Sequence, residues 1–265
     1  MIASLPGDLA LAYDEAGSGA PLLLIHGWPH DRRLWAGQLG GLASYARVLA
    51  PDLRGVGGST VRGPYTIDQY ADDLADFLTS LGIARAVVCG LSMGGYIAFA
   101  MLRRHRERIR GLILADTRAT ADTDEVRANR ARLIALIEQE GMTALANRQL
   151  QSSVARATLE RQPQLLESVR RMMASVPAEG AIGALRAMAE RPDSTLLLGT
   201  IDVPTLVVGG AEDSVTPPDV LRSMAASIPK SRVEILEQAG HLSPLERSAA
   251  FNHVASEFLG ALLYH

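Results

Sequence analysis

The first feature of this sequence that could do chemistry is a serine placed between two glycines. Gly90-Leu91-Ser92-Met93-Gly94 follows a short apolar run and precedes residues with a helical pattern. In this G-x-S-x-G spacing, the glycines let neighbouring backbone pass close to a very tight strand-to-helix turn, from which the serine hydroxyl projects. The spacing predicts that Ser92 is a nucleophile; the alternative is a turn whose serine only caps the helix.

A serine hydroxyl is weakly nucleophilic at neutral pH, so the site also needs a base, and histidine is the usual one. The chain has six histidines. We expect His241 to be the base because it follows a strand candidate and precedes Pro244 and a final helix. The settings of the others favour structural roles: within the final helix, among arginines, in a proline-containing loop, at the chain end or after a buried strand (His253, His105, His30, His265 and His26).

An acidic residue should orient the histidine, and the expected order along the chain is serine, acid, histidine. Asp213 fits this order because it follows a strand candidate, residues 205–208, that runs into a loop. The alternatives are Glu212, which suits a solvated loop, and Asp116, which follows the preceding strand candidate and suits a helix cap. We predict that Asp213 is the acid.

Acyl transfer also needs two hydrogen-bond donors for the oxyanion, commonly backbone N–H groups. The N–H of Met93, directly after the serine, is one candidate. The second is the N–H of Trp28 in the segment His26-Gly27-Trp28-Pro29, although Trp28 could instead be a core aromatic residue. For His26 we favour a buried, hydrogen-bonded structural role.

Short apolar runs of strand length recur along the chain with helical patterns between them. They are residues 22–25, 47–51, 86–89, 112–115, 206–208 and 233–236. A helix is expected after Thr66, with a possible capping box completed by Gln69 and an end at Gly82. Residues 9–13 and the turn after them predict a hairpin that leads into the strand at 22–25. The alternation predicts an α/β fold whose mostly parallel sheet has helices on both faces, with the functional loops at the carboxyl ends of the strands.

Residues 119–191 break this alternation, because they contain helical patterns such as 126–140 and 165–176 but no strand candidate. We predict a core domain formed by residues 1–118 and 192–265, with residues 119–191 as a helical cap insertion. Methionine suits an adaptable apolar pocket wall, although packing of the cap on the core is the more common role. The insertion contains Met142, Met172, Met173 and Met188.

Composition narrows the classes of partner. The 265 residues are 48% hydrophobic, and 26 basic against 29 acidic residues give a formal charge of −3. A mildly acidic chain has no basic field for nucleic acid or anionic membrane, and no apolar run approaches a membrane span. The single cysteine, Cys89, excludes an internal disulfide. We therefore expect a small-molecule substrate, no nucleic-acid or membrane partner, and a cytoplasmic location; the oligomeric state is left open.

Two weaker patterns imply neither a cofactor nor a metal. Residues 55–60 resemble a dinucleotide-binding fingerprint, but Thr60 stands where the third glycine would be and no helix opens there. His26 and His30 are four residues apart, yet Gly27 and Pro29 between them would break a helix. We predict no cofactor and no metal site.

The motifs together resemble the α/β-hydrolase superfamily. They are His26-Gly27-Trp28-Pro29, residues 52–59, residues 90–95, and Asp213 followed by Gly240-His241. More narrowly, residues 114–117, 191–195 and 204–218 are similar to the 3-oxoadipate enol-lactonase-like and small-esterase branch, which includes cofactor-free haloperoxidase-like perhydrolases. That family usually carries a proline shortly after the glutamate that follows the histidine, whereas this chain has Glu246-Arg247-Ser248.

The resemblance implies a serine hydrolase that cleaves carboxylic esters or lactones of small molecules through an acyl-enzyme. Perhydrolysis, with peroxide in place of water, and C–C bond hydrolysis are alternatives within the same chemistry. A ligand receptor that keeps the fold but turns over very slowly is the alternative from another class.

Overall fold

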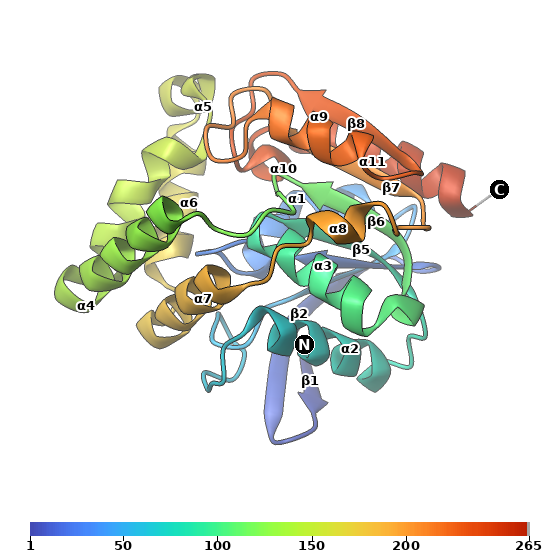
Figure 1. Ribbon diagram of the computed structural model, residues 1–265, viewed down its shortest axis with the longest axis horizontal. Coiled ribbons are helices and arrows are strands. Elements are labelled where there is room, and N and C mark those ends of the chain that lie inside the picture. Colours follow the sequence, from blue (N-terminus) through green and yellow to red (C-terminus); the bar gives the residue numbers. More distant parts are fainter. Residues whose placement is uncertain (264–265) are drawn as a thin grey trace.

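A mostly parallel sheet of eight strands forms the centre of the protein (Figure 1). The computed structural model describes residues 1–263. The strands lie in the order β1-β2-β4-β3-β5-β6-β7-β8, and only β1 and β2 pair antiparallel to their neighbours. Their bounds are β1 Ile2–Leu5, β2 Leu9–Ala16, β3 Pro21–Ile25, β4 Arg47–Pro51, β5 Ala86–Leu91, β6 Ile109–Ala115, β7 Thr205–Gly210 and β8 Ser231–Leu236. The predicted fold class is confirmed.

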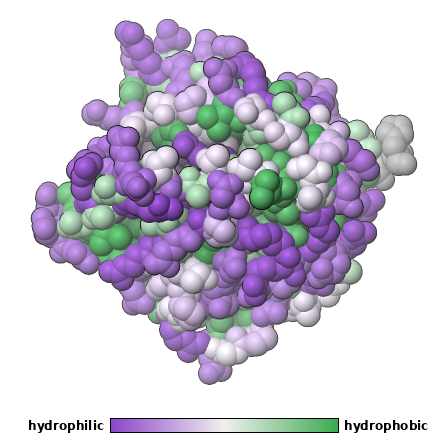
Figure 2. Space-filling model, in the orientation of Figure 1, coloured by the Kyte–Doolittle hydropathy of each residue, from purple (hydrophilic) through white to green (hydrophobic). Residues whose placement is uncertain are grey.

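Helices cover both faces of the sheet. The helices α2 (Ile67–Ser80), α3 (Met93–Arg104) and α9 (Pro218–Ala226) share one hydrophobic cluster with the sheet, and α11 (Ser248–Leu263) shares the other. Short helices complete the core: α1 Ala36–Gly41, α8 Thr195–Leu198, α10 Ser243–Glu246 and two 3₁₀ turns at Arg32–Trp35 and Arg106–Arg108. On the face shown in Figure 2, hydrophilic side chains predominate and the hydrophobic patches are small and separate.

The wholly apolar runs of the sequence are explained by this double covering. In β3, Leu23 and Ile25 belong to the cluster under α2 and α3, whereas Leu22 and Leu24 belong to the cluster under α11. Successive side chains of a strand point to opposite faces, so a strand covered on both faces has no polar positions.

The hairpin predicted between residues 9–13 and 22–25 is wrong. β2 pairs with β4 and not with β3, and its hairpin partner is the preceding strand β1. β4 lies between β2 and β3 because β3 pairs with β4 in parallel register. The turn at Gly17 and Gly19 therefore joins two strands that are not neighbours.

The helix predicted after Thr66 begins there, with half of the predicted capping box. Thr66 Oγ1 accepts a hydrogen bond from Gln69 N–H at 2.9 Å. The Gln69 side chain does not return to Thr66 but donates to Asp73 Oδ1 at 3.1 Å. The helix ends before Gly82, which has a φ of 67°.

Residues 119–191, here called the cap segment, contain four helices and no strand. They are α4 (Asp124–Ser153), α5 (Arg156–Arg161), α6 (Pro163–Ala174) and α7 (Ala178–Glu190), grouped to one side of the sheet in Figure 1. Gly141, with φ 79° and ψ 179°, interrupts α4 and divides it into two pieces. In the described part of the chain, no helix is long and apolar enough to cross a membrane.

Candidate active site

Ser92 lies on a strained turn between β5 and α3. Its φ of 52° and ψ of −113° are rarely adopted by a residue with a side chain, and strain of this kind persists only where the surroundings enforce it. Here they do: a Cβ on Gly90 would overlap the Gly94 carbonyl, and a Cβ on Gly94 would overlap the Ile25 carbonyl. The two glycines of the motif are therefore required by close backbone packing, and the turn presents the Ser92 hydroxyl at the carboxyl edge of the sheet.

The structure brings Ser92, His241 and Asp213 together from the ends of three strands. His241 Nε2 lies 2.9 Å from Ser92 Oγ, and His241 Nδ1 lies 2.8 Å from Asp213 Oδ2. The other carboxylate oxygen, Asp213 Oδ1, accepts from Val215 N–H at 2.7 Å and Thr216 N–H at 2.9 Å. An ionised carboxylate accepts only, so Nδ1 carries the proton and Nε2 presents its lone pair to the serine.

The two alternative acids have other contacts. Asp116 is fully buried at the end of β6, accepts from Gly210 N–H at 2.9 Å and from Ser243 Oγ–H at 2.5 Å, and makes no hydrogen bond to the histidine. Burial and the nearby charge of Asp213 raise the pKa of Asp116 well above its usual value. Glu212 accepts from Arg156 N–H at 3.0 Å.

The segment that carries Trp28 passes directly beside Ser92. A Cβ built on Gly27 would lie 3.3 Å from Ser92 Cβ. The backbone N–H groups of Trp28 and Met93 have no hydrogen-bond acceptor within residues 1–263. The indole of Trp28 donates to Ala181 O at 3.0 Å, which ties this segment to α7. Both predicted oxyanion donors are thus uncommitted and near the serine.

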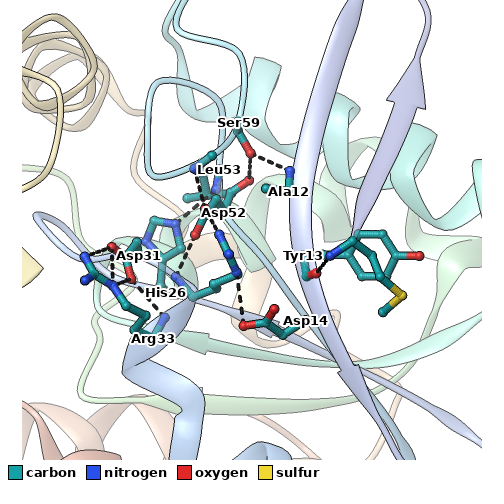
Figure 3. A network of polar contacts seen from close by, with 12 residues as sticks. Ala12, Tyr13, Asp14, His26, Asp31, Arg33, Asp52, Leu53 and Ser59 are labelled. Carbon is teal, nitrogen blue, oxygen red and sulfur yellow. Dashed lines mark hydrogen bonds and ion pairs between the residues drawn. The ribbon is translucent and has the colours of Figure 1, made fainter.

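His26 stabilises the segment of Gly27 and Trp28 through buried hydrogen bonds. It is fully buried; its Nε2 accepts from Leu53 N–H at 3.1 Å, and its Nδ1 donates to Gly27 O at 3.0 Å. Because Nε2 accepts a hydrogen bond, the ring is neutral, and burial lowers the pKa of His26 in the same sense. Figure 3 shows the ring between the Asp31–Arg33 pair and the loop of Asp52. These contacts match the structural role that we favoured for His26.

The other histidines lie outside the cluster or have no partner. His105, half-buried at the end of α3, lies 2.7 Å from Asp72, and His253, exposed on α11, lies 3.4 Å from Glu257. His30 is buried, and neither of its ring nitrogens has a partner within residues 1–263. Burial and the neighbouring His26 and His241 lower the pKa of His30 to about 3. The sixth, His265, lies outside the described residues.

A cavity of about 270 Å³ opens beside Ser92 and His241. The core contributes Trp28, Pro29, Tyr96 and Val215, and the cap segment contributes its far wall: Val126, Asn129, Arg130, Leu133, Gln149, Ser152, Ser153 and Met188. Of the four methionines in the cap segment, only Met188 lines this cavity; Met142, Met172 and Met173 are buried in the hydrophobic clusters. A larger hollow of about 540 Å³ lies at the amino ends of β7 and β8, on the opposite edge of the sheet.

The polar residues of this wall were missed in the sequence analysis. Residues 126, 129, 130 and 133 have the i, i+3, i+4, i+7 spacing that puts side chains on one face of a helix, and residues 149, 152 and 153 repeat part of it. That periodicity was readable, but it cannot say which face of a helix meets the serine.

One buried carboxylate fixes the position of two arginines near the cavity. Asp122 pairs with Arg130 and, at 2.5 Å, with Arg191. Burial acts to raise the pKa of Asp122, but the hydrogen bonds and charges of the two arginines outweigh it and hold the pKa below its usual value. Arg191 also stacks 3.9 Å above the ring of Tyr96, which lines the cavity. This cluster carries one positive charge in excess.

Comparisons with known proteins agree with this geometry. A family model described as alpha/beta hydrolase fold matches residues 20–248. The chain is 32% identical to 3-oxoadipate enol-lactonase 2 of Acinetobacter baylyi over 249 residues, 93% of this chain and 91% of that protein. It is 29% identical to a putative non-heme bromoperoxidase of Mycobacterium tuberculosis over 260 residues, 95% of this chain and 98% of the relative.

A solved structure is similar over the whole chain. The thermophilic esterase from Thermogutta terrifontis is 40% identical, with a TM-score of 0.95 and coverage of 99% of this chain and 98% of that one. The sequence match, the eight-stranded sheet and the turn at Ser92 lead to one conclusion. The chain belongs to the α/β hydrolase fold family.

Proposed function

We propose that the protein is a serine hydrolase that cleaves carboxylic esters or lactones of small molecules. The observation that carries this proposal is the continuous chain of hydrogen-bonding atoms from Ser92 Oγ through His241 to Asp213, with distances of 2.9 and 2.8 Å. A serine, a base and an acid in this order have the geometry of nucleophilic acyl transfer.

In the proposed mechanism, Ser92 Oγ attacks the ester carbonyl while His241 Nε2 takes its proton. The N–H groups of Met93 and Trp28 stabilise the oxyanion. His241 then returns the proton to the leaving alcohol, which departs and leaves an acyl-enzyme. Water attacks the acyl group, with His241 again as base, and releases the acid. Asp213 holds the imidazole in the tautomer that both steps need.

The cavity favours small substrates with polar groups. A volume of about 270 Å³ holds a short acyl or alcohol group. Apolar contacts come from Val126, Leu133 and Met188, and polar contacts from Asn129 and Gln149. In this proposal the core domain, residues 1–118 and 192–265, performs the chemistry, and the cap segment, residues 119–191, supplies most of the substrate contacts. The cytoplasmic location and the absence of cofactor, metal and nucleic-acid partner stay predictions.

Perhydrolysis is a second candidate because the M. tuberculosis relative is named a putative bromoperoxidase. Hydrogen peroxide would replace water in the second half of the reaction: the acyl group moves from Ser92 to peroxide, which gives a peracid and free serine. Both reactions use the same acyl-enzyme, so the structure fits water and hydrogen peroxide equally well as the molecule that attacks it.

A substrate screen separates these functions. Acetate, butyrate and octanoate esters of p-nitrophenol and small lactones are incubated with the protein, with and without peroxide. Multiple turnovers without peroxide support the hydrolase. Peracid formation that exceeds acid release supports the perhydrolase, and a single turnover at most supports a ligand receptor.

A further inference from the structure

The cap segment and the loop of His241 are joined by one buried carboxylate, Glu246. Its side chain is buried, and its two oxygens divide between two parts of the chain. Oε1 accepts from Gly240 N–H at 2.8 Å and Leu242 N–H at 3.3 Å, which flank the catalytic histidine. Oε2 accepts at 2.7 Å from both Ala155 N–H and Thr158 Oγ–H, at the start of α5 in the cap segment.

All four partners of Glu246 act as donors to it, and three of them are backbone N–H groups that cannot do otherwise. Burial raises the pKa of Glu246, while the four hydrogen bonds act in the opposite direction. A carboxylate has enough acceptor capacity for four donors and needs no proton of its own. The arrangement is therefore specific for a carboxylate at this position.

Backbone packing at the same place points to the same connection. A Cβ on Gly240 would lie 2.6 Å from Ala155 N and 2.9 Å from Val154 Cα. Gly240 thus lets the backbone before His241 lie directly against the segment that leaves α4. This contact does not involve the Glu246 side chain, so it is an independent observation.

The loop of the acid touches the same short stretch of the cap segment. Glu212, which precedes Asp213, accepts from Arg156 N–H at 3.0 Å. Ser214, which follows Asp213, donates to Ser152 O at 3.4 Å. Residues 152–158 therefore contact the loops of both the base and the acid.

We propose that Glu246 is a positioning residue that fastens the loop of His241 to the cap segment, so that the cap helps to assemble the catalytic site. This inference rests on the proposed serine-hydrolase function. It changes the division of labour proposed above: residues 152–158 are a support for the base and the acid, in addition to any role in substrate choice.

Glutamine at position 246 tests the proposal because it has nearly the same shape with half the acceptor capacity. If the amide oxygen keeps Gly240 and Leu242, the NH₂ group faces the N–H of Ala155, and that donor loses its partner. If it keeps Ala155, the loop of His241 loses both bonds. Either orientation leaves at least one backbone N–H without its acceptor and so weakens the link between the cap segment and the loop of His241.

The experiment measures kcat and KM for p-nitrophenyl acetate and the rate at which a fluorophosphonate labels Ser92. The variants are Glu246→Gln and Thr158→Val, the second of which removes one donor on the cap side and leaves both loop bonds. The control is Glu237→Gln, because Glu237 is an exposed glutamate in the same loop between β8 and α10. Acetate is chosen because a small acyl group needs few contacts with the cap.

We expect Glu246→Gln to lower kcat about 10-fold to 100-fold and to slow labelling in proportion, because a base displaced by a fraction of an ångström loses its alignment with the nucleophile. KM should stay within about 2-fold of wild type if substrate contacts are unchanged. Thr158→Val should lower kcat in the same direction by a smaller factor, and Glu237→Gln should match wild type.

Wild-type kcat in folded Glu246→Gln overturns the positioning role, as does a rise in KM with kcat unchanged. Wild-type kcat in Thr158→Val overturns the part played by the cap, and this variant decides the matter if Glu246→Gln does not fold. Turnover of acetate by the wild-type protein tests the proposed hydrolase function separately.

Discussion

Asparagine at position 213 should leave the fold intact and disable the base. The side chain of Asp213 now accepts three hydrogen bonds: one from His241 and two from the N–H groups of Val215 and Thr216. The asparagine amide offers one oxygen and one NH₂ group, so one side of this arrangement must meet a donor. The outcome depends on which side keeps the oxygen.

The amide oxygen of the asparagine should stay on the side of the Val215 and Thr216 N–H groups. Turning the oxygen to His241 would aim the NH₂ group at two N–H groups and leave both without an acceptor, which costs about 1–3 kcal/mol for each buried group. With the oxygen facing these backbone N–H groups, the NH₂ group faces His241 Nδ1. Nδ1 must then accept a hydrogen bond, so the imidazole takes the tautomer with its proton on Nε2. Nε2–H then points at Ser92 Oγ and cannot take its proton. We expect kcat to fall about 10⁴-fold, which is about 5 kcal/mol of transition-state stabilisation.

The assay compares kcat for p-nitrophenyl acetate in Asp213→Asn and Asp116→Asn, with circular dichroism and thermal unfolding to check the fold. Asp116→Asn is the matched control, because an asparagine oxygen can accept from Gly210 N–H while its NH₂ group donates to Ser243. It should keep kcat within about 3-fold, since loss of a charge at a buried carboxyl with a raised pKa removes little. A folded Asp213→Asn with kcat within 10-fold of wild type, or a larger loss in Asp116→Asn, would refute the reasoning.

Three other predictions follow from the same geometry. A fluorophosphonate should label one serine per chain, Ser92, and Ser92→Ala should lower kcat on the order of 10⁶-fold; mass spectrometry that finds the label elsewhere contradicts this. Met188→Ala should shift the preference among acyl chain lengths by roughly 1 to 3 kcal/mol, whereas Met173→Ala, buried away from the cavity, should lower Tm and leave the ranking alone. His30 should stay neutral in the folded protein down to about pH 3, whereas the unfolded chain protonates this histidine below about pH 6.5, so the free energy of unfolding should decrease as the pH drops. Urea unfolding at pH 5 should therefore show that His30→Leu loses about 2 kcal/mol less stability than the wild type on acidification from pH 7. An equal loss in both proteins would mean that His30 is charged in the folded state.

The placement of the three proposed catalytic residues at one edge of the sheet was the most predictable feature of this protein. Ser92, Asp213 and His241 each follow a strand, and in a parallel sheet all such positions meet at one edge, so the order of elements alone brings them near one another. The partner of β2 was not predictable in the same way, because pairing with β4 depends on a strand about 35 residues away. The role of Glu246 and the polar face of α4 in the cavity were also not predicted, because their partners lie in segments whose relative placement follows from tertiary packing.

The break in α4 at Gly141 has a consequence for changing which substrates the proposed hydrolase would accept. It separates the cavity wall into two panels, Val126 to Leu133 before the break and Gln149 to Ser153 after it. At Gly141, nothing beyond the adjacent backbone of α4 lies within 4 Å of the place a Cβ would take, so other parts of the protein do not crowd this point. A library of one- to three-residue insertions at this point would change the angle between the panels while each keeps its own helical register. Such a library would explore cavity shapes that point substitutions cannot reach, without altering the sheet that carries the nucleophile.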